Sequence, residues 1–220
     1  MPMNHQRRIT LALIATLLVA FTVGFLTEGL RASMLFQWVL QPGDSLSFEV
    51  TVTGYASVGS TPQPPPFAVM NGSVIRATVE NLPNFTIFMR IDDFPGEVVG
   101  FMKTSSTFAN GSQIPVSQYF QINDLVSRSI LPVGNWRTLD MYFPDSVRLA
   151  VNSTSAESFI AADRGNMFLI GYTRLTTAQA SGWFSYVNKT TGAPLSMSLW
   201  AWSNVQPYIY SYNVTLTSIL

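Results

Sequence analysis

Few side chains in this chain have the types and spacing that catalysis needs. There is one histidine, His5, and no cysteine among the 220 residues. His5 precedes a long apolar segment, described below, that is expected to separate it from residues 36–220. We therefore expect no Ser-His-Asp triad, no thiol nucleophile and no histidine- or cysteine-ligated metal in that region.

The carboxylates do not form a recognisable site either. Asp92, Asp93 and Glu97 could supply oxygen ligands, but their spacing fits no calcium loop, and a solvated strand end is the expected structure. Three distant acids could in principle make a glycosidase pair, yet nothing in the sequence predicts a separation of about 5–10 Å between any two of them. These acids are Asp140, Asp145 and Asp163.

Lysine chemistry would require a desolvated amino group. Lys103 and Lys189 are the only lysines, and both lie in polar stretches that we expect to be exposed, so a Ser–Lys dyad is not predicted. The sequence thus predicts a protein that is not an enzyme, with no catalytic residue, no cofactor and no metal.

Aromatic side chains gather in the last third of the chain. They can line a lipid or glycan site, or a protein interface, although strand alternation already assigns many of them to the inner face of a sheet. The candidates for a ligand site or interface are Trp183, Trp200, Trp202, Tyr208, Tyr210 and Tyr212.

Asn-x-Ser/Thr sequons are more frequent than expected. Chance predicts about two for this composition, and the excess favours an exported, N-glycosylated surface. The alternative is that loops rich in serine and threonine produce sequons by themselves. The glycosylation candidates are Asn71, Asn84, Asn110, Asn152, Asn188 and Asn213.

The segment that sets the location of all these groups is residues 9–26, ITLALIATLLVAFTVGFL, which has no charged residue. As a helix it would be about 27 Å long, close to the roughly 30 Å hydrocarbon core of a bilayer. Arg7 and Arg8 precede it, and the positive-inside rule then places the N-terminus in the cytoplasm. We expect a signal-anchor helix retained in the lipid bilayer. The alternative is a cleaved signal peptide and a secreted protein.

This segment divides the chain into a cytoplasmic tail (1–8), a transmembrane helix (9–26), a linker (27–35) and one extracytoplasmic domain (36–220). Charged residues make up only 11% of the chain, against a usual ~25%. No basic patch is present, so nucleic acid is not an expected partner. Without cysteine, the domain must be stabilised by its core rather than by disulfides.

The first half of the domain predicts strands. Leu46, Phe48, Val50 and Val52 alternate with polar residues, as in a half-buried strand. Similar runs occupy residues 75–80 and 85–92, so three antiparallel strands are expected in succession. Residues 56–67 contain three consecutive prolines and are predicted to be a loop.

The spacing of the apolar residues changes at residue 115. Tyr119, Ile122, Val126 and Ile130 recur at helical spacing, and Pro132 would stop the helix, so one amphipathic helix is predicted over residues 115–131. A shorter helical piece is expected within residues 145–162.

From residue 167 onward the pattern predicts strands again, with a turn at residues 188–192. In the last strand Tyr208, Tyr210 and Tyr212 share one face, while Asn213 occupies the other. The predicted fold class is α+β, mainly antiparallel β, as a sandwich or incomplete barrel with one packed helix.

Two passages resemble known families. Trp38 followed by residues 43–50, GDSLSFEV, resembles the start of the exported domain in uncharacterised single-anchor cell-surface proteins of archaea, especially the Asgard group. Residues 182–187, GWFSYV, with residues 191–195, TGAPL, are similar both to those proteins and to a hairpin in LolA/LppX-like lipoprotein carriers. The carrier resemblance implies an incomplete antiparallel barrel, closed by a helix, around an apolar cavity for lipid.

Together these features predict a membrane-anchored, N-glycosylated, non-catalytic protein of the cell surface or envelope. Its partners would be other surface proteins or further copies of itself. The alternative is a membrane-tethered carrier or binder of lipid or another apolar ligand, and an enzyme is the third hypothesis.

Overall fold

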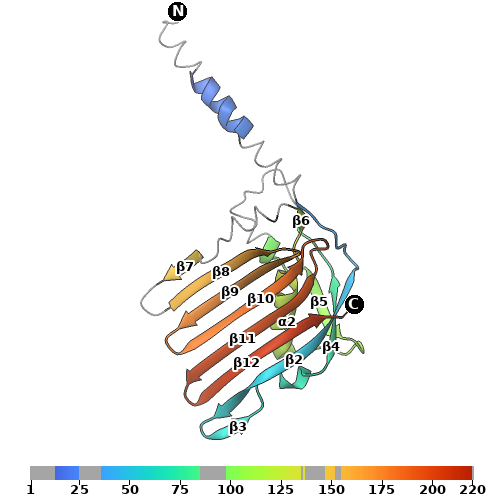
Figure 1. Cartoon of the computed structure of the whole chain (residues 1–220), viewed down its shortest axis with the longest axis vertical. Coiled ribbons are helices and arrows are strands. Elements are labelled where there is room, and N and C mark those ends of the chain that lie inside the picture. The colour runs from blue at the N-terminus through green and yellow to red at the C-terminus, as the bar shows by residue number, and fades with distance from the viewer. Residues whose placement is uncertain are drawn as a thin grey trace, which may run out of the picture.

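A computed structural model gives the structure of the chain and describes residues 13–24, 36–84, 98–134, 136, 147–151 and 155–219. Residues 13–24 form a helix with exposed apolar side chains, such as Leu17 and Phe21 (Figure 1). The rest of the predicted transmembrane segment lies outside the described residues. Within the described part, no helix has both the length and the apolar character needed to cross a membrane.

Ten strands form one antiparallel sheet in the order β5-β4-β2-β12-β11-β10-β9-β8-β7, with β3 paired to β2 (Figure 1). A separate short pair joins β1 (Phe36–Gln37) to β6 (Val133–Gly134). The strands of the sheet are β2 (Ser45–Val58), β3 (Thr61–Gln63), β4 (Val74–Val79), β5 (Thr104–Phe108), β7 (Val147–Val151), β8 (Ser155–Arg164), β9 (Met167–Thr176), β10 (Gln179–Asn188), β11 (Pro194–Val205) and β12 (Tyr208–Ser218).

The predicted α+β class is confirmed, but the sheet is open rather than a sandwich or a barrel within the described residues. The last strand, β12, pairs with the first long strand, β2, over eleven positions, from Tyr208↔Val58 to Ser218↔Phe48. This pairing joins the two halves of the chain into one layer and leaves β5 and β7 as its edges.

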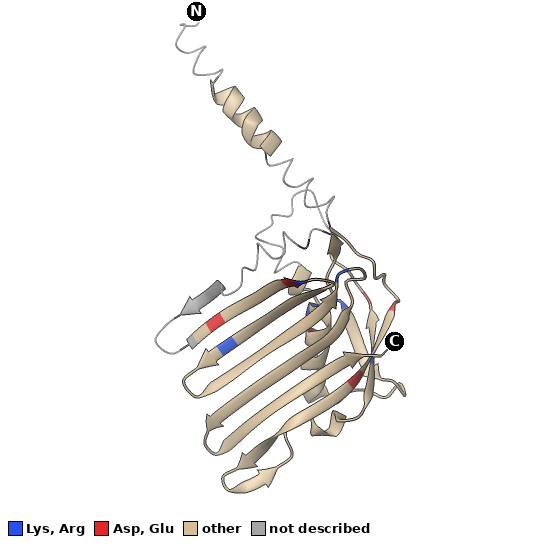
Figure 2. Cartoon of the chain, in the orientation of Figure 1, with Lys and Arg blue, Asp and Glu red and all other residues tan. Residues whose placement is uncertain are grey.

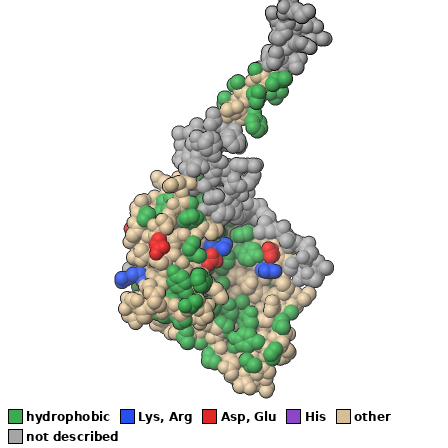
Figure 3. Space-filling model, turned by 180° about the vertical axis from the view of Figure 1, so that it is seen from behind, with side chains coloured by type: hydrophobic (Ala, Val, Ile, Leu, Met, Phe, Trp, Pro, Cys, Tyr) green, Lys and Arg blue, Asp and Glu red, His purple; other side chains and the backbone are tan. Residues whose placement is uncertain are grey.

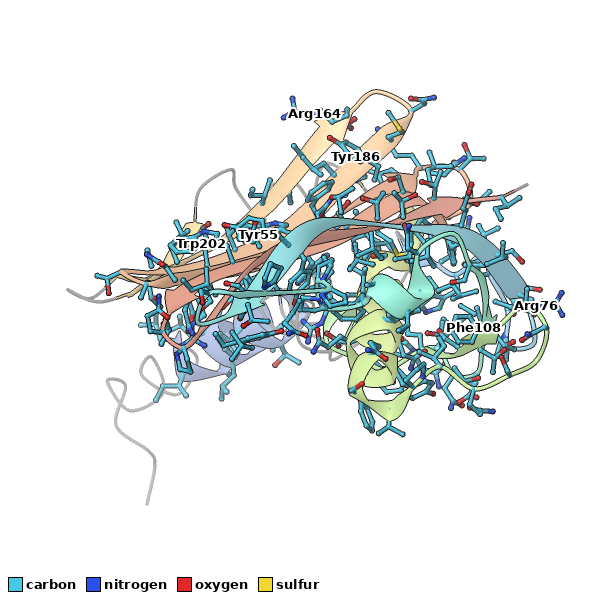
Figure 4. All side chains as sticks on the ribbon, turned by 90° about the horizontal axis from the view of Figure 1, so that it is seen from below. Tyr55, Arg76, Phe108, Arg164, Tyr186 and Trp202 are labelled. Atoms are coloured by element: carbon cyan, nitrogen blue, oxygen red, sulfur yellow. The ribbon has the colours of Figure 1, made fainter. Side chains whose placement is uncertain are left out.

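The helix α2 (Val116–Ser129) packs on one face of the sheet, which we call the inner face. It contacts β5 at the edge as well as β10 and β11 in the middle, so the sheet curls around it (Figures 1 and 4). The space between them is filled by fully buried side chains that include Phe48, Ile75, Ile122 and Met197. A one-turn 3-10 helix, η1 (Ala68–Met70), adds Met70 to this core.

Several predicted elements are confirmed. The alternating runs became β2 and β4, with Phe48, Val50 and Ile75 fully buried on the inner face. The predicted helix is α2, and the C-terminal strands and the turn at residues 188–192 also form as expected. The strand predicted over residues 85–92 lies outside the described residues.

The predicted loop over residues 56–67 is partly wrong. Residues 56–58 complete β2, and residues 61–63 pair back with them as β3. Gly59 has φ +59°, the left-handed conformation that a tight turn needs. Pro62 fits in β3 because that strand pairs only with β2, and proline is tolerated on a free edge.

The helix predicted within residues 145–162 is wrong for the described residues, which form β7 and β8. β8 pairs with β9 at every position from Ser155↔Thr176 to Arg164↔Met167, and this pairing outweighs a weak local preference. The strand β5 was not predicted, because its sequence, TSSTF, lacks alternating apolar residues.

Candidate functional site

The predicted aromatic candidates lie on both faces of the sheet rather than in one cluster. Tyr208, Tyr210 and Tyr212 point to the inner face with Val214, as predicted, and Asn213 lies on the outer face. Register places Trp183, opposite Leu199, on the inner face as well. The other two tryptophans lie on the outer face. Trp200 is opposite Asn213, and Trp202 is opposite Ser211.

A surface groove lies beside the inner-face tyrosines and has a volume of about 270 Å³. The C-terminal strand, the first turns of α2 and the segment before η1 all contribute to it. We call it the tyrosine groove. Its lining residues are Pro66, Phe67, Ser117, Gln118, Gln121, Tyr208, Tyr210 and Tyr212.

Aromatic rings form a continuous row along one wall of the tyrosine groove. The ring centroids of Phe67 and Tyr212 are 5.5 Å apart, those of Tyr212 and Tyr210 are 5.7 Å apart, and those of Tyr210 and Tyr208 are 5.3 Å apart. Each ring packs on the next at an interplanar angle between 29° and 46°.

Phe67 anchors this row. Its side chain is only 4% exposed, and its backbone has φ +67°, which is rare for a residue with a large side chain. Its ring packs against that of Tyr212. Strained residues of this kind gather at functional sites, which favours the groove as a site.

The tyrosine groove is uncharged. None of its lining residues is ionised at neutral pH, and burial, with smaller effects from Tyr210 and Tyr208, raises the pKa of Tyr212 to about 12. The three central strands β10, β11 and β12 contain no Lys, Arg, Asp or Glu (Figure 2). On the face that carries α2, hydrophobic side chains are abundant and charged ones are few (Figure 3).

One polar atom beside the tyrosine groove has no partner. The side-chain oxygen Oε1 of Gln118 is buried and accepts no hydrogen bond from any described residue. Such an atom costs about 1–3 kcal/mol relative to a satisfied one.

A second set of polar groups is buried between β5 and α2, and it corrects the prediction that Lys103 is exposed. Lys103 is fully buried, with Nζ donating to the carbonyl oxygen of Ser127 at 2.6 Å and lying 5.9 Å from the centroid of the Trp38 ring. Burial, helped by the nearby Arg128, lowers the pKa of Lys103 to about 7, while Asp124 opposes the shift.

The geometry around Lys103 differs from that of a nucleophilic dyad. The Ser127 hydroxyl accepts the backbone N–H groups of Lys103 and Thr104 at 3.1 and 3.2 Å, whereas the lysine amine bonds to the backbone carbonyl. Both side chains are almost completely buried. In this arrangement the pair fastens β5 to α2.

The remaining chemical candidates are accounted for as follows. Lys189 forms an ion pair with Asp163 at 2.6 Å, which lowers the pKa of that carboxyl. In the part of the chain that the structure covers, no three His, Cys, Asp or Glu side chains converge as a metal site would require. The other acids considered lie outside it: Asp92, Asp93, Glu97, Asp140 and Asp145.

The sequons differ in how their asparagines are held. In Asn71, Asn110 and Asn188 the side-chain oxygen accepts a backbone N–H, which leaves the nitrogen, where a glycan would attach, out of that bond. In Asn213 the nitrogen instead donates to Thr215 Oγ1 at 3.1 Å. Asn84 is exposed, and Asn152 lies outside the described residues.

Comparison with known proteins gives little further guidance. No family model and no curated protein matches the chain. Among solved structures, it has a TM-score of 0.25 and 8% identity to a mutant of the vaccine antigen transferrin binding protein B from Haemophilus parasuis. The match covers 83% of this chain, and the chain spans only 28% of that protein.

The sequence predicted the three tyrosines of the groove but not its other walls. Gln118 and Gln121 are three residues apart and therefore share one side of α2, a signal that was available locally. Nothing local joins them to β12, about ninety residues later. Phe67 was assigned to a stiff loop, and its contact with Tyr212 depends on the β2–β12 pairing.

Proposed function

We propose that this chain is a non-catalytic binding protein of the cell surface, tethered to the membrane by its N-terminal segment and presenting residues 36–220 outside the cell. The tyrosine groove would hold its partner. The main support is the groove itself, an uncharged recess lined by aromatic rings and by hydroxyl and amide side chains.

The tether is supported by the apolar helix. Leu13, Leu17, Leu18 and Phe21 are each more than half exposed, which is costly in water and favourable in lipid. The basic residues before it and the sequons after it support an outside position for the domain.

The apolar-carrier alternative finds less support. The layer between α2 and the sheet, where a lipid would lie, is filled by side chains such as Leu125, Val126 and Met197. The tyrosine groove is about 270 Å³ in volume, at or below the lower end of ligand pockets and small for an acyl chain.

Photo-crosslinking in the source cell tests the proposal without assuming what the partner is. A photoreactive phenylalanine would replace Tyr208, which is 42% exposed at the groove, in the full chain. The matched control replaces Tyr55, which is 60% exposed on the outer face of the same sheet (Figure 4).

We expect a defined adduct from position 208 and none of the same mass from position 55. The adduct should also weaken when Tyr210 is replaced by alanine. Equal labelling at both positions, or no adduct at either, would contradict the proposal.

A further inference from the structure

We propose that the ligand of the tyrosine groove is a neutral saccharide. This rests on the binding function proposed above and specifies its chemistry. The inference combines three features of the groove: its lack of charge, the hydroxyl and amide groups of its α2 wall and its row of tyrosines.

The lack of charge disfavours ionic ligands. The eight lining residues include no Lys, Arg, His, Asp or Glu, so a phosphate, a carboxylate or an ammonium group would lose its hydration without gaining an ion pair. The raised pKa of Tyr212 keeps its hydroxyl protonated across the physiological range. Such a surface therefore binds an uncharged ligand with the smallest loss of hydration free energy.

The polar side chains of the α2 wall disfavour ligands without hydrogen-bonding groups. Ser117 and Gln121 are exposed and place a hydroxyl and a primary amide in the groove lining. An acyl chain or a proline ring would displace water from these groups without replacing its hydrogen bonds, although aromatic grooves often bind proline-rich peptides. A sugar hydroxyl both donates and accepts, so it can bond to either group.

The three tyrosines of the groove also suit a sugar ring. Tyr208, Tyr210 and Tyr212 form a run of neighbouring rings in the groove lining, each bearing a hydroxyl that can donate and accept. A sugar ring carries several hydroxyls around its rim and apolar C–H groups on its faces. The groove volume of about 270 Å³ suits one or two such rings rather than a folded partner.

The test measures binding of free trisaccharides to the purified full chain. The probes are maltotriose, cellotriose, mannotriose and chitotriose, each with a free reducing end and as the methyl glycoside, which mimics an attached glycan. The chain is kept in a detergent without a sugar headgroup, since maltosides would compete. Affinity is measured by calorimetry or by saturation-transfer NMR at ligand concentrations up to about 10 mM. Such concentrations are needed because a millimolar dissociation constant, as expected for a single groove, corresponds to a binding free energy of only about 4 kcal/mol.

Three variants locate the binding. Tyr208→Ala removes a partly exposed ring, Tyr210→Phe removes only a hydroxyl, and Gln121→Met removes an exposed amide at nearly constant size. We expect Tyr208→Ala and Gln121→Met to weaken the best probe about tenfold, equivalent to about 1.4 kcal/mol. The control, Tyr55→Ala on the outer face, should leave affinity unchanged.

Each outcome of the binding test either supports or overturns the saccharide inference. Binding that is weakened by the groove variants supports the inference, and the form of the reducing end that binds tells whether the source is a free oligosaccharide or an attached glycan. No binding of any probe, or binding unaffected by Tyr208→Ala, overturns it. If crosslinking at position 208 succeeds while every saccharide fails, the groove binds a partner of another class, and only the saccharide inference is lost.

Discussion

Lys103 is the residue whose environment most strongly affects stability. Its amino group has one hydrogen bond, to the Ser127 carbonyl, and no ion pair with a described residue. Burial lowers its pKa from 10.5 to about 7. At neutral pH and below, the folded state must therefore bear part or all of the cost of a buried cation.

The first prediction is that stability increases with pH. Between pH 7 and 9.5 the unfolded lysine keeps its proton while the folded one releases it, so the free energy of unfolding should rise by up to about 1.4 kcal/mol per pH unit. Above that window Tyr212 opposes this rise, because burial raises its pKa to about 12 in the folded state and it ionises more readily when unfolded.

Urea unfolding at several pH values, compared between the wild type and Lys103→Met, measures this effect. The methionine variant should be more stable at pH 6, and its stability should be nearly independent of pH between pH 6 and 9.5. A slope that persists in Lys103→Met would show that another group causes it.

The second prediction concerns Asn123, the polar residue that α2 turns toward β5. Its Oδ1 accepts hydrogen bonds from Thr104 Oγ1 and Ser106 Oγ, and its Nδ2 donates to the Thr104 carbonyl at 2.6 Å. Asn123→Ala removes all three hydrogen bonds, although Thr104 Oγ1 keeps its bond with Ser127 Oγ, and should reduce the free energy of unfolding by about 3 kcal/mol. Asn204→Ala, at an exposed site on β11, should change it by less than about 0.5 kcal/mol in the same denaturant assay.

Among the strands, the pairing of β2 with β12 has the largest structural role, because it joins the N-terminal and C-terminal halves of the sheet. Gly54 lies opposite Tyr212 in this pair and has φ +132°, a conformation that other residues rarely adopt. A Cβ atom at this position would overlap the carbonyl oxygen of Ser211. Glycine is therefore required both for the backbone angle and for the close approach.

The third prediction is that Gly54→Ala destabilises the fold by about 2–4 kcal/mol and weakens crosslinking at position 208, since Tyr212 would shift with β12. Gly43→Ala is the matched control. Gly43 also has a positive φ, +98°, but a Cβ there meets open space, so only the backbone strain of about 1 kcal/mol should appear. Equal losses in the two variants, by thermal or denaturant unfolding, would rule out the close approach as the cause.

The arrangement of the full chain gives the fourth prediction. In the tethered protein, a tag at the C-terminus should be accessible to antibody on intact cells, whereas a tag at the N-terminus should be detected only after permeabilisation. Loss of the N-terminal tag from the mature protein would instead indicate a cleaved signal. A C-terminal tag that stays inaccessible on intact cells would contradict export altogether.

Glycosylation provides an independent readout of export. Asn110 lies on an exposed turn with its side-chain nitrogen outside the turn's hydrogen bonds, so it is the sequon we expect to be modified most readily. Asn110→Gln should remove one glycan mass from the intact protein by mass spectrometry. If the variant carries the same glycan mass as the wild type, this sequon is not glycosylated.

Features that depend on near neighbours along the chain could be predicted from the sequence. Alternation of apolar and polar residues predicted β2, β4 and β12, together with the faces of Tyr208, Tyr210, Tyr212 and Asn213, because side chains alternate across a strand regardless of its partner. Helical spacing predicted α2 for the same reason. Composition also indicated a core without disulfides and a surface with few charges.

Tertiary structure decided what depends on contacts between distant segments. Lys103 sits in a polar stretch that looks exposed, and only the packing of α2 on β5 buries it. Similarly, the tyrosines became a groove because β12 returned beside β2 and brought them to Phe67 and Gln118. Local periodicity tells which face a side chain takes, but which segment meets that face is set by strand register and long-range packing.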